Sequence, residues 1–273
     1  SEMGIRDRRI TLGQALRKGG VSLQDFTQAD RSRQGIVAYF EAHIEQGPVL
    51  EAEEKAVGVV TAIAAQYRFM VKITGVAGHA GTMPMSLRQD ALAAAAEAIL
   101  CIEQTAQQGA PDLVATVGSL TVAPGAPNVV PGEVCFTLDI RAGTEEVRNA
   151  AAQSIQAALG ALAKQRSVAF SMTQQQDLAA TPCDTVLMQY LSDAVQDVTQ
   201  QDARQLVSGA GHDAMVMAAL APVCMLFIRC EKGISHNPAE AVKTSDVETA
   251  LQVMVRFIET YAGSFGVKVE KIA

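Results

Sequence analysis

The stretch YRFMVKIT at residues 67–74 alternates polar and apolar side chains, with Phe69, Val71 and Ile73 on one side. An alternation with a period of two is typical of a half-buried β-strand. The segment over 86–108 is rich in Ala, Leu and Gln, which predicts a long helix. This part of the chain therefore begins with a strand that is followed by a helix.

The next segments complete a pattern of strands and helices. Strands are predicted at 113–122 and 133–141, with a Pro- and Gly-rich turn over 124–132 between them. A second helix over 144–164 and a strand over 166–173 follow. The order strand, helix, strand, strand, helix, strand is the split βαβ arrangement of ferredoxin-like units.

The flanking parts predict a second, interrupted domain. Residues 36–41 form a short buried helix or strand, and residues 57–63 are strand-like. After the ferredoxin-like unit, helices and strands alternate, which implies an α/β sheet. The predicted elements are a helix at 184–200, a strand at 204–208, a helix at 212–220, a strand at 222–229 and a helix at 245–262.

The fold expected from these patterns is α/β with three sequence segments. Residues 64–177 form the ferredoxin-like domain. Residues 1–63 and 178–273 form the domain that it interrupts.

Composition excludes several classes of partner. The net charge is -7 over 273 residues, without a Lys/Arg cluster, which argues against nucleic acid. No apolar run is long enough to span a membrane, and the charged N-terminus has no apolar core of a signal peptide. The five cysteines form no Cys-x-x-Cys pair, so free thiols in a reducing cytoplasm are expected.

Four histidines lie beside glycines or in polar turns, where scaffolds often place functional groups. His43 lies in Ala-His-Ile-Glu-Gln-Gly-Pro, and a neutral imidazole there suits a metal ion, with Glu45 able to orient it. His236 lies in a loop before the last helix. For both residues, a histidine that caps a turn is the alternative interpretation.

Two further histidines sit in glycine-rich turns. His79 has glycines on both sides, which let a backbone pass close to a ligand. Gly211 and His212 lie where a glycine-rich turn opens a helix, and a helix N-terminus can bind an anion. A glycine loop alone is weak support for such a site.

Three other polar residues are candidates for substrate binding. Arg141 ends a strand, and arginine pairs with carboxylates through two parallel hydrogen bonds. Asn128 lies in an elaborate Pro/Gly turn, and Arg68 lies at a strand start. Each could equally be a solvated surface residue.

Together these motifs resemble one family. They are AHIEQGPVLE at 42–51, GHAGTMPMSLRQDALAAAAE at 78–97, PNVVPG at 127–132, LDIRAG at 138–143, SGAGHDAMVMA at 208–218 and FIRCEKGISHNPAE at 227–240. The chain resembles the allantoate amidohydrolase and N-carbamoyl-L-amino-acid hydrolase branch of the aminoacylase-like dinuclear metallopeptidases. That resemblance implies a metal-binding α/β catalytic domain interrupted by a ferredoxin-like lid and dimerisation domain.

The resemblance also implies roles for the candidate residues. His43 and His236 match one ligand each to two divalent metal ions, manganese or zinc. His79 matches the lid histidine that stabilises the oxyanion in the neighbouring subunit of a homodimer.

Substrate contacts are implied for the remaining candidates. Arg68, Asn128 and Arg141 match positions that hold the substrate, with Arg141 on its carboxylate. Gly211 and His212 match a loop that lines the pocket.

The sequence departs from the family at its beginning. Family members carry a His-x-Asp motif, a bridging Asp and a Glu-Glu pair in an N-terminal segment, and this chain has none of them. Those residues supply the other metal ligands and the general base. We therefore expect a fragment that retains metal ions poorly and is inactive alone.

For the full-length parent, the resemblance implies hydrolysis of a ureido C–N bond. The segment Gln66-Tyr67-Arg68 favours allantoate, which gives ureidoglycine, ammonia and carbon dioxide. The alternative substrate is an N-carbamoyl-L-amino acid. An alternative of another class is a catalytically inert fragment that serves only dimerisation or binding.

Overall fold

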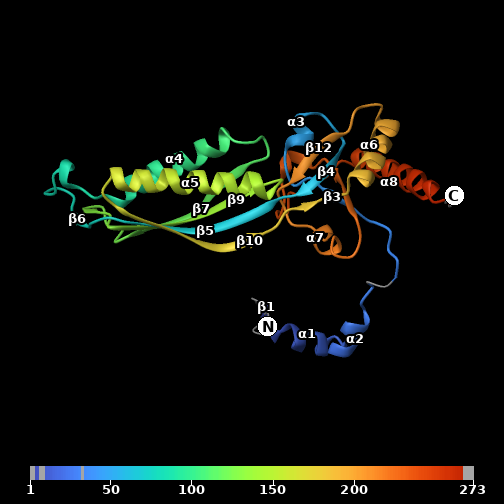
Figure 1. Ribbon diagram of the computed structural model, residues 1–273, viewed down its shortest axis with the longest axis horizontal. Helices are drawn as coiled ribbons and strands as arrows, with labels where there is room; N and C mark the ends of the chain where they lie inside the picture. Colours follow the sequence, from blue (N-terminus) through green and yellow to red (C-terminus); the bar gives the residue numbers. More distant parts are fainter. Residues whose placement is uncertain (1–3, 6–9, 32–33, 267–273) are drawn as a thin grey trace.

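The computed structural model describes residues 4–5, 10–31 and 34–266, and most of them belong to two units with a β-sheet each (Figure 1). We call residues 65–178 the four-stranded unit. Residues 39–63 and 181–264 make up the five-stranded unit. This mixed arrangement of sheets and helices confirms the α/β fold class.

The four-stranded unit has the connectivity predicted from sequence. Its elements are β5 (Ala65–Thr74), α4 (Ala91–Gln107), β7 (Val114–Ala123), β9 (Glu133–Ala142), α5 (Glu145–Gln165) and β10 (Ala169–Leu178). The sheet order is β10-β5-β9-β7, with every neighbouring pair antiparallel. This is the ferredoxin-like topology.

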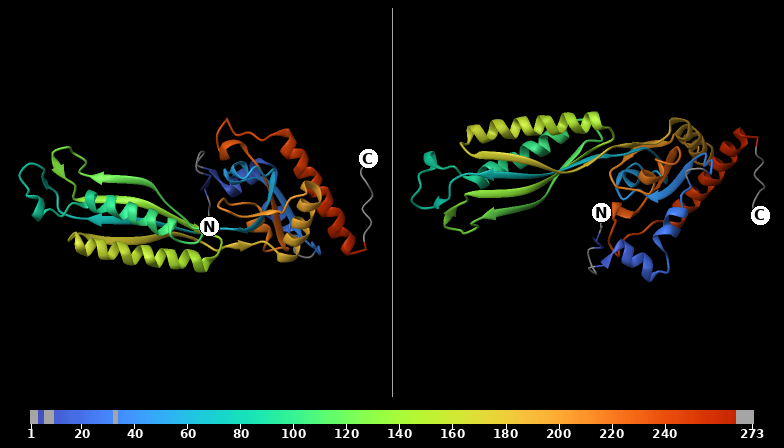
Figure 2. Two further views of the ribbon diagram at one scale, coloured as in Figure 1. Left: turned by 90° about the horizontal axis from the view of Figure 1, so that it is seen from above. Right: turned by 60° about the horizontal axis from the view of Figure 1, so that its bottom comes forward.

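Both helices of this unit cover one face of its sheet (Figures 1 and 2). The alternation seen in the sequence places Phe69, Val71 and Ile73 in the core, together with Phe136 and Leu138 of β9. The residues between them on β5 and β9 point to the opposite, uncovered face, because side chains alternate along a strand. That second face carries the polar groups described below.

The five-stranded unit contains the candidate metal residues. Its strands are β3 (Tyr39–Ile44), β4 (Val57–Ile63), β11 (Thr181–Pro182), β12 (Arg204–Ser208) and β13 (Val223–Ile228). Strand β13 lies between β3, to which it is parallel, and β4, to which it is antiparallel, while β12 pairs with β4 in parallel. The ambiguous segment 36–41 enters strand β3 only at Tyr39, and its start is not buried as expected, because Ile36 and Val37 are exposed.

Helices cover both faces of the five-stranded sheet. Helices α6 (Thr185–Thr199) and α8 (Thr244–Ser264) pack on one core, and α3 (Val49–Ala52) and α7 (Ala214–Met217) contribute to the other. The predicted helix over 212–220 is thus much shorter than expected. Among the described residues, none of the helices has the length and apolar character to cross a bilayer.

Short elements complete the described chain. They are β1 (Gly4–Ile5), β2 (Ile10–Thr11), α1 (Leu12–Lys18), α2 (Leu23–Gln28), β6 (Gly78–His79), β8 (Val129–Val130) and the 3₁₀ turns η1 (Met85–Leu87) and η2 (Glu231–Gly233). Helices α1 and α2 lie apart from both sheets (Figure 1). The β6–β8 pair lies at the end of the four-stranded unit that is remote from the five-stranded unit (Figure 1).

The two units meet where β4 passes into β5 and β10 passes into β11. Arg148 of α5 is buried at this junction, and its Nη1 donates to the carbonyl of Leu178 at 2.6 Å and to Asp177 Oδ1 at 3.0 Å. Its guanidinium also lies 3.6 Å from the centre of the Tyr67 ring, a cation–π contact. One side chain therefore ties α5 to both connecting strands.

Candidate active site

His43 lies on β3 with a defined ring orientation. Its Nδ1 is 2.8 Å from the carbonyl oxygen of Ile44. A carbonyl can only accept, so Nδ1 carries a proton, and in the neutral form of the ring the lone pair is on Nε2. This is the tautomer that a metal-binding imidazole needs.

His212 packs beside His43 but is enclosed. The two ring centres are 4.8 Å apart in an edge contact, and the His212 side chain is 1% exposed. Its Nε2 lies 2.6 Å from Ser208 Oγ. Burial, with a smaller contribution from His43, lowers the pKa of His212 to about 4, so the ring is neutral near pH 7.

The other ring nitrogen of His212 faces a carboxylate. Nδ1 has no hydrogen-bond partner among the described residues, and Glu41 Oε1 lies 3.7 Å from it. Glu41 Oε2 accepts from the Ala214 N–H at 2.8 Å. The sequence reasoning missed Glu41 and Ser208, although Glu41 is two residues from His43 on one strand and Ser208 is four residues before His212.

Glu45 does not orient His43, which corrects the expectation from sequence. Its two carboxylate oxygens accept from the N–H groups of Val49 and Leu50 at 2.8 and 2.9 Å. Glu45 thus satisfies the free donors at the start of α3. Burial raises its pKa above the ordinary value.

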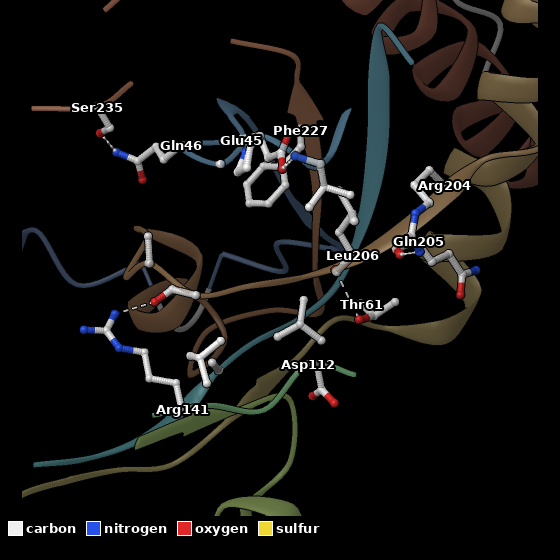
Figure 3. Close-up of a pocket in the computed structure, with 18 of the residues that line it drawn as sticks. Glu45, Gln46, Thr61, Asp112, Arg141, Arg204, Gln205, Leu206, Phe227 and Ser235 are labelled. Carbon is white, nitrogen blue, oxygen red and sulfur yellow. Dashed lines mark hydrogen bonds between the residues drawn. The ribbon is translucent and has the colours of Figure 1, made fainter. Parts of the chain in front are cut away.

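A cavity of about 790 Å³ lies where the two units face each other (Figure 3). Arg141, from the four-stranded unit, and His236, from the loop after η2, both line it. Gln46 and Ser235, which are joined by a hydrogen bond of 2.7 Å, form part of the same wall (Figure 3). His43 and His212 are not among the lining residues.

Arg68 and Arg141 meet through Asp139 on the uncovered face of the sheet. Arg141 binds Asp139 with Nε at 2.7 Å and Nη2 at 3.1 Å, and Arg68 Nε binds it at 2.9 Å. Arg141 Nη1 also donates to the carbonyl of Gly209 in the five-stranded unit (Figure 3). Two of the predicted substrate residues are therefore brought together beside the cavity.

His79 and Asn128 form a separate group at the remote end of the four-stranded unit (Figure 1). The Asn128 carbonyl accepts from the Ala80 N–H at 2.9 Å, and His79 Nδ1 accepts from the Gly81 N–H at 3.0 Å. Within one copy of the chain, the fold keeps this group away from His43 and His236. Gly211, at the start of the segment that carries His212, is exposed.

The described residues do not complete a metal site. Over residues 4–5, 10–31 and 34–266, no three His, Cys, Asp or Glu side chains are grouped so that they could hold one ion. His43 offers a free Nε2, and His236 lies at the cavity wall. One imidazole per ion is fewer than the three protein ligands of a typical catalytic zinc.

Comparison with known proteins places this arrangement in a family. The model of peptidase family M20/M25/M40 matches residues 14–260. A protein named probable allantoate deiminase from Oryza sativa subsp. japonica is 41% identical over 258 residues, which cover 85% of this chain and 52% of that protein. An N-carbamoyl-L-amino-acid amidohydrolase from Pseudomonas sp. (strain NS671) is 39% identical, with 93% of this chain and 62% of that protein covered.

Solved structures agree with the sequence matches. A hydantoinase/carbamoylase family amidase from Burkholderia multivorans superposes with a TM-score of 0.85 at 32% identity, over 94% of this chain and 61% of that one. The chain spans about half to three-fifths of the length of these relatives. The matches extend across both units and agree with the family resemblance of the motifs. The chain belongs to peptidase family M20/M25/M40.

Proposed function

We propose that this chain is part of a metal-dependent hydrolase that cleaves a ureido C–N bond, with allantoate as substrate. Allantoate and one water would give ureidoglycine, carbon dioxide and ammonia. The observation that carries the proposal is the pair Arg68 and Arg141, joined through Asp139, of which Arg141 lines the same cavity as His236. The guanidinium group of an arginine binds a carboxylate through paired N–H donors, and its remaining N–H groups can donate to a ureido oxygen.

An N-carbamoyl-L-amino acid is the second candidate substrate. Relatives with both names have similar identity to this chain, at 41% and 39%. Arg68, whose side chain is 53% exposed, favours allantoate, because that substrate carries two ureido arms and needs a second polar contact beside Arg141. A fusion of this chain to the N-terminal segment of the rice relative, assayed for ammonia release from both substrates, tests the choice; faster turnover of the N-carbamoyl amino acid would reverse it.

The proposed enzyme uses two divalent metal ions, manganese or zinc. His43 and His236 would supply one ligand each, and a bound divalent ion lowers the pKa of its water to make a nucleophile. The remaining ligands and the general base would have to come from outside the described residues. Arg141 would hold the substrate carboxylate, which lowers the entropic cost of reaching the attack geometry.

The 273-residue chain alone should bind manganese and zinc weakly and release no ammonia from allantoate. One imidazole per ion leaves most of the coordination to water, so the affinity should be low. Calorimetric titration with each metal, followed by an ammonia assay, measures both quantities, and His43→Ala and His236→Ala serve as controls. Tight stoichiometric binding with ammonia release would show that the ligands are misassigned.

A binding or assembly module is the alternative of another class. The lack of a three-ligand group among the described residues favours it for the chain alone. The fusion protein described above separates the two functions. An inert module would gain neither metal nor turnover when the N-terminal segment is added.

We also propose that the chain acts as a homodimer through the four-stranded unit. His79 cannot reach the cavity of its own copy, so a catalytic role for it needs a second copy. The segment 75–90, which contains His79, also carries three exposed apolar side chains, Val76, Met85 and Leu87. Large exposed apolar side chains that gather in one place are typical of protein contacts.

Sedimentation at micromolar concentration should therefore show a dimer. Leu87→Glu should shift the equilibrium toward monomer, because it places a charge in the apolar contact. Leu251→Glu, at an exposed apolar position on α8, is the matched control and should leave the dimer intact. A strict monomer in the unsubstituted chain would contradict the proposal.

A cytoplasmic location is part of the proposal. All five cysteines are free thiols, and free thiols persist in reducing compartments.

A further inference from the structure

Asp139 occupies the centre of the arginine group and was not a candidate from sequence. On the paired strands β5 and β9, Arg68 lies opposite Asp139, and Gln66 lies opposite Arg141. Their neighbours Phe69, Leu138 and Ile140 belong to the core, so these four polar side chains share the uncovered face. Strand pairing therefore fixes which donors reach Asp139.

Three side chains donate to this single carboxylate. Oδ2 accepts from Gln66 Nε2 at 2.6 Å, from Arg68 Nε at 2.9 Å and from Arg141 Nη2 at 3.1 Å. Oδ1 accepts from Arg141 Nε at 2.7 Å. With Nη1 bound to the Gly209 carbonyl, Arg141 is held on both sides and cannot rotate freely.

Asp139 also sets the charge of the group. Burial opposes its ionisation, but hydrogen bonds from Arg141 and Arg68 more than offset this and hold the pKa of Asp139 below its usual value. It is therefore ionised at neutral pH. Two guanidinium groups and one carboxylate give the group of Arg68, Arg141 and Asp139 a single net positive charge, and Arg141 places this group at the cavity.

We propose that Asp139 determines substrate specificity by limiting this charge to one unit. Such a site matches an anion with one carboxylate. In a ligand with two carboxylates, the second carboxylate would lie near Asp139 and not near an unpaired cation. Repulsion between these like charges selects against such a ligand. The inference rests on the proposed function, because it assumes that the arginine group receives the substrate carboxylate.

The test uses the unaltered 273-residue chain and two probes. N-carbamoylglycine carries one carboxylate, and N-carbamoyl-L-aspartate carries two. Calorimetry and NMR titration of the arginine Nε–H signals give both affinities. The unsubstituted chain should prefer N-carbamoylglycine, and Asp139→Asn should shift the affinity ratio toward N-carbamoyl-L-aspartate by about tenfold or more.

A matched control lies on the same two strands. Glu133 pairs with Lys72 at 2.7 Å, and neither residue lines the cavity. Glu133→Gln removes a carboxylate from an ion pair of the same sheet without changing the charge beside the cavity. It should leave the affinity ratio unchanged.

Two further variants keep the test decisive if Asp139→Asn does not fold. Asp139→Glu retains the charge and should retain the preference for one carboxylate. Arg68→Gln removes one positive charge from a side chain that is 53% exposed, so folding is not at risk. Arg68→Gln should weaken the binding of both probes and shift the affinity ratio further toward N-carbamoylglycine.

The proposal is overturned if the unsubstituted chain binds neither probe. It is also overturned if Arg68→Gln or a folded Asp139→Asn leaves the ratio unchanged. Failure of the proposed function is read separately, as absence of ureido hydrolysis by the fusion protein. If the affinity ratio shifts but the fusion protein hydrolyses no ureido substrate, the role of Asp139 in selecting carboxylates is supported. The proposed hydrolytic function is then contradicted.

Discussion

Arg148→Ala should lower the free energy of unfolding by about 2–4 kcal/mol, because it removes a buried charge that holds α5 against the ends of β5 and β10 at the junction of the two units. The Arg148 side chain is 3% exposed, and it donates to the carbonyl of Leu178 and to Asp177. Its loss leaves a space against the Tyr67 ring and a carbonyl without its donor. Asp177 is 51% exposed and can be solvated, so the loss should stay below that for a fully buried pair.

Urea denaturation of the variant and the unsubstituted chain measures this loss. Arg256→Ala is the matched control, because Arg256 pairs with Asp197 at 2.7 Å while both side chains are about half exposed. Its loss should be about 0–1 kcal/mol, as for other exposed ion pairs. If both variants lose the same free energy of unfolding, the contacts of Arg148 at the junction do not stabilise the fold more than an exposed ion pair does.

The sequence predicted the four-stranded unit well because its pattern is local. Strands with a period of two and two long helices can be assigned from short windows. Helix α4 begins at Ala91 and not at 86, because the Asp90 side chain accepts from the N–H groups of Leu92 and Ala93 and starts the helix there. The Asp90 cap could have been identified from the sequence.

Elements fixed by distant contacts were not predictable in the same way. Strands β6 and β8 are two residues long and join loops that are about fifty residues apart in the chain, a pairing that no local pattern encodes. The helix predicted over 212–220 is reduced to Ala214–Met217 in the structure. Its N-terminus is held by Glu41, which lies far away in sequence.

In the candidate site, too, features with a local sequence signal were predictable and features fixed by distant contacts were not. Loop histidines and strand-end arginines could be selected by residue type, and the structure brings Arg68 and Arg141 together. The hydrogen-bonding partners of these residues could not be predicted from the sequence, because they depend on the register of the paired strands. Asp139 binds both arginines only because β5 and β9 pair in one particular alignment.

Arg141→Ala in the longer hydrolase that we propose should weaken substrate binding by about 2–5 kcal/mol, as expected when one side of a partly buried charge pair is truncated. Arg141 lines the cavity and is 29% exposed, so it is accessible to a carboxylate yet shielded from bulk water. After its removal, Asp139 would still be paired with Arg68. The group would then carry no net charge and would no longer attract an anion.

Steady-state kinetics with allantoate separates this role from a structural one. Arg141→Lys keeps the charge but loses the planar fork, so it should restore only part of the affinity. Arg204 is the matched control, because it lines the same cavity but its Nε is held by Glu53 at 2.8 Å. Arg204→Ala should change kcat/KM by no more than about threefold, as expected for an exposed ion pair. A similar loss for both alanine variants would mean that general positive charge in the cavity attracts the substrate, and unchanged kinetics for Arg141→Ala would remove Arg141 from the site.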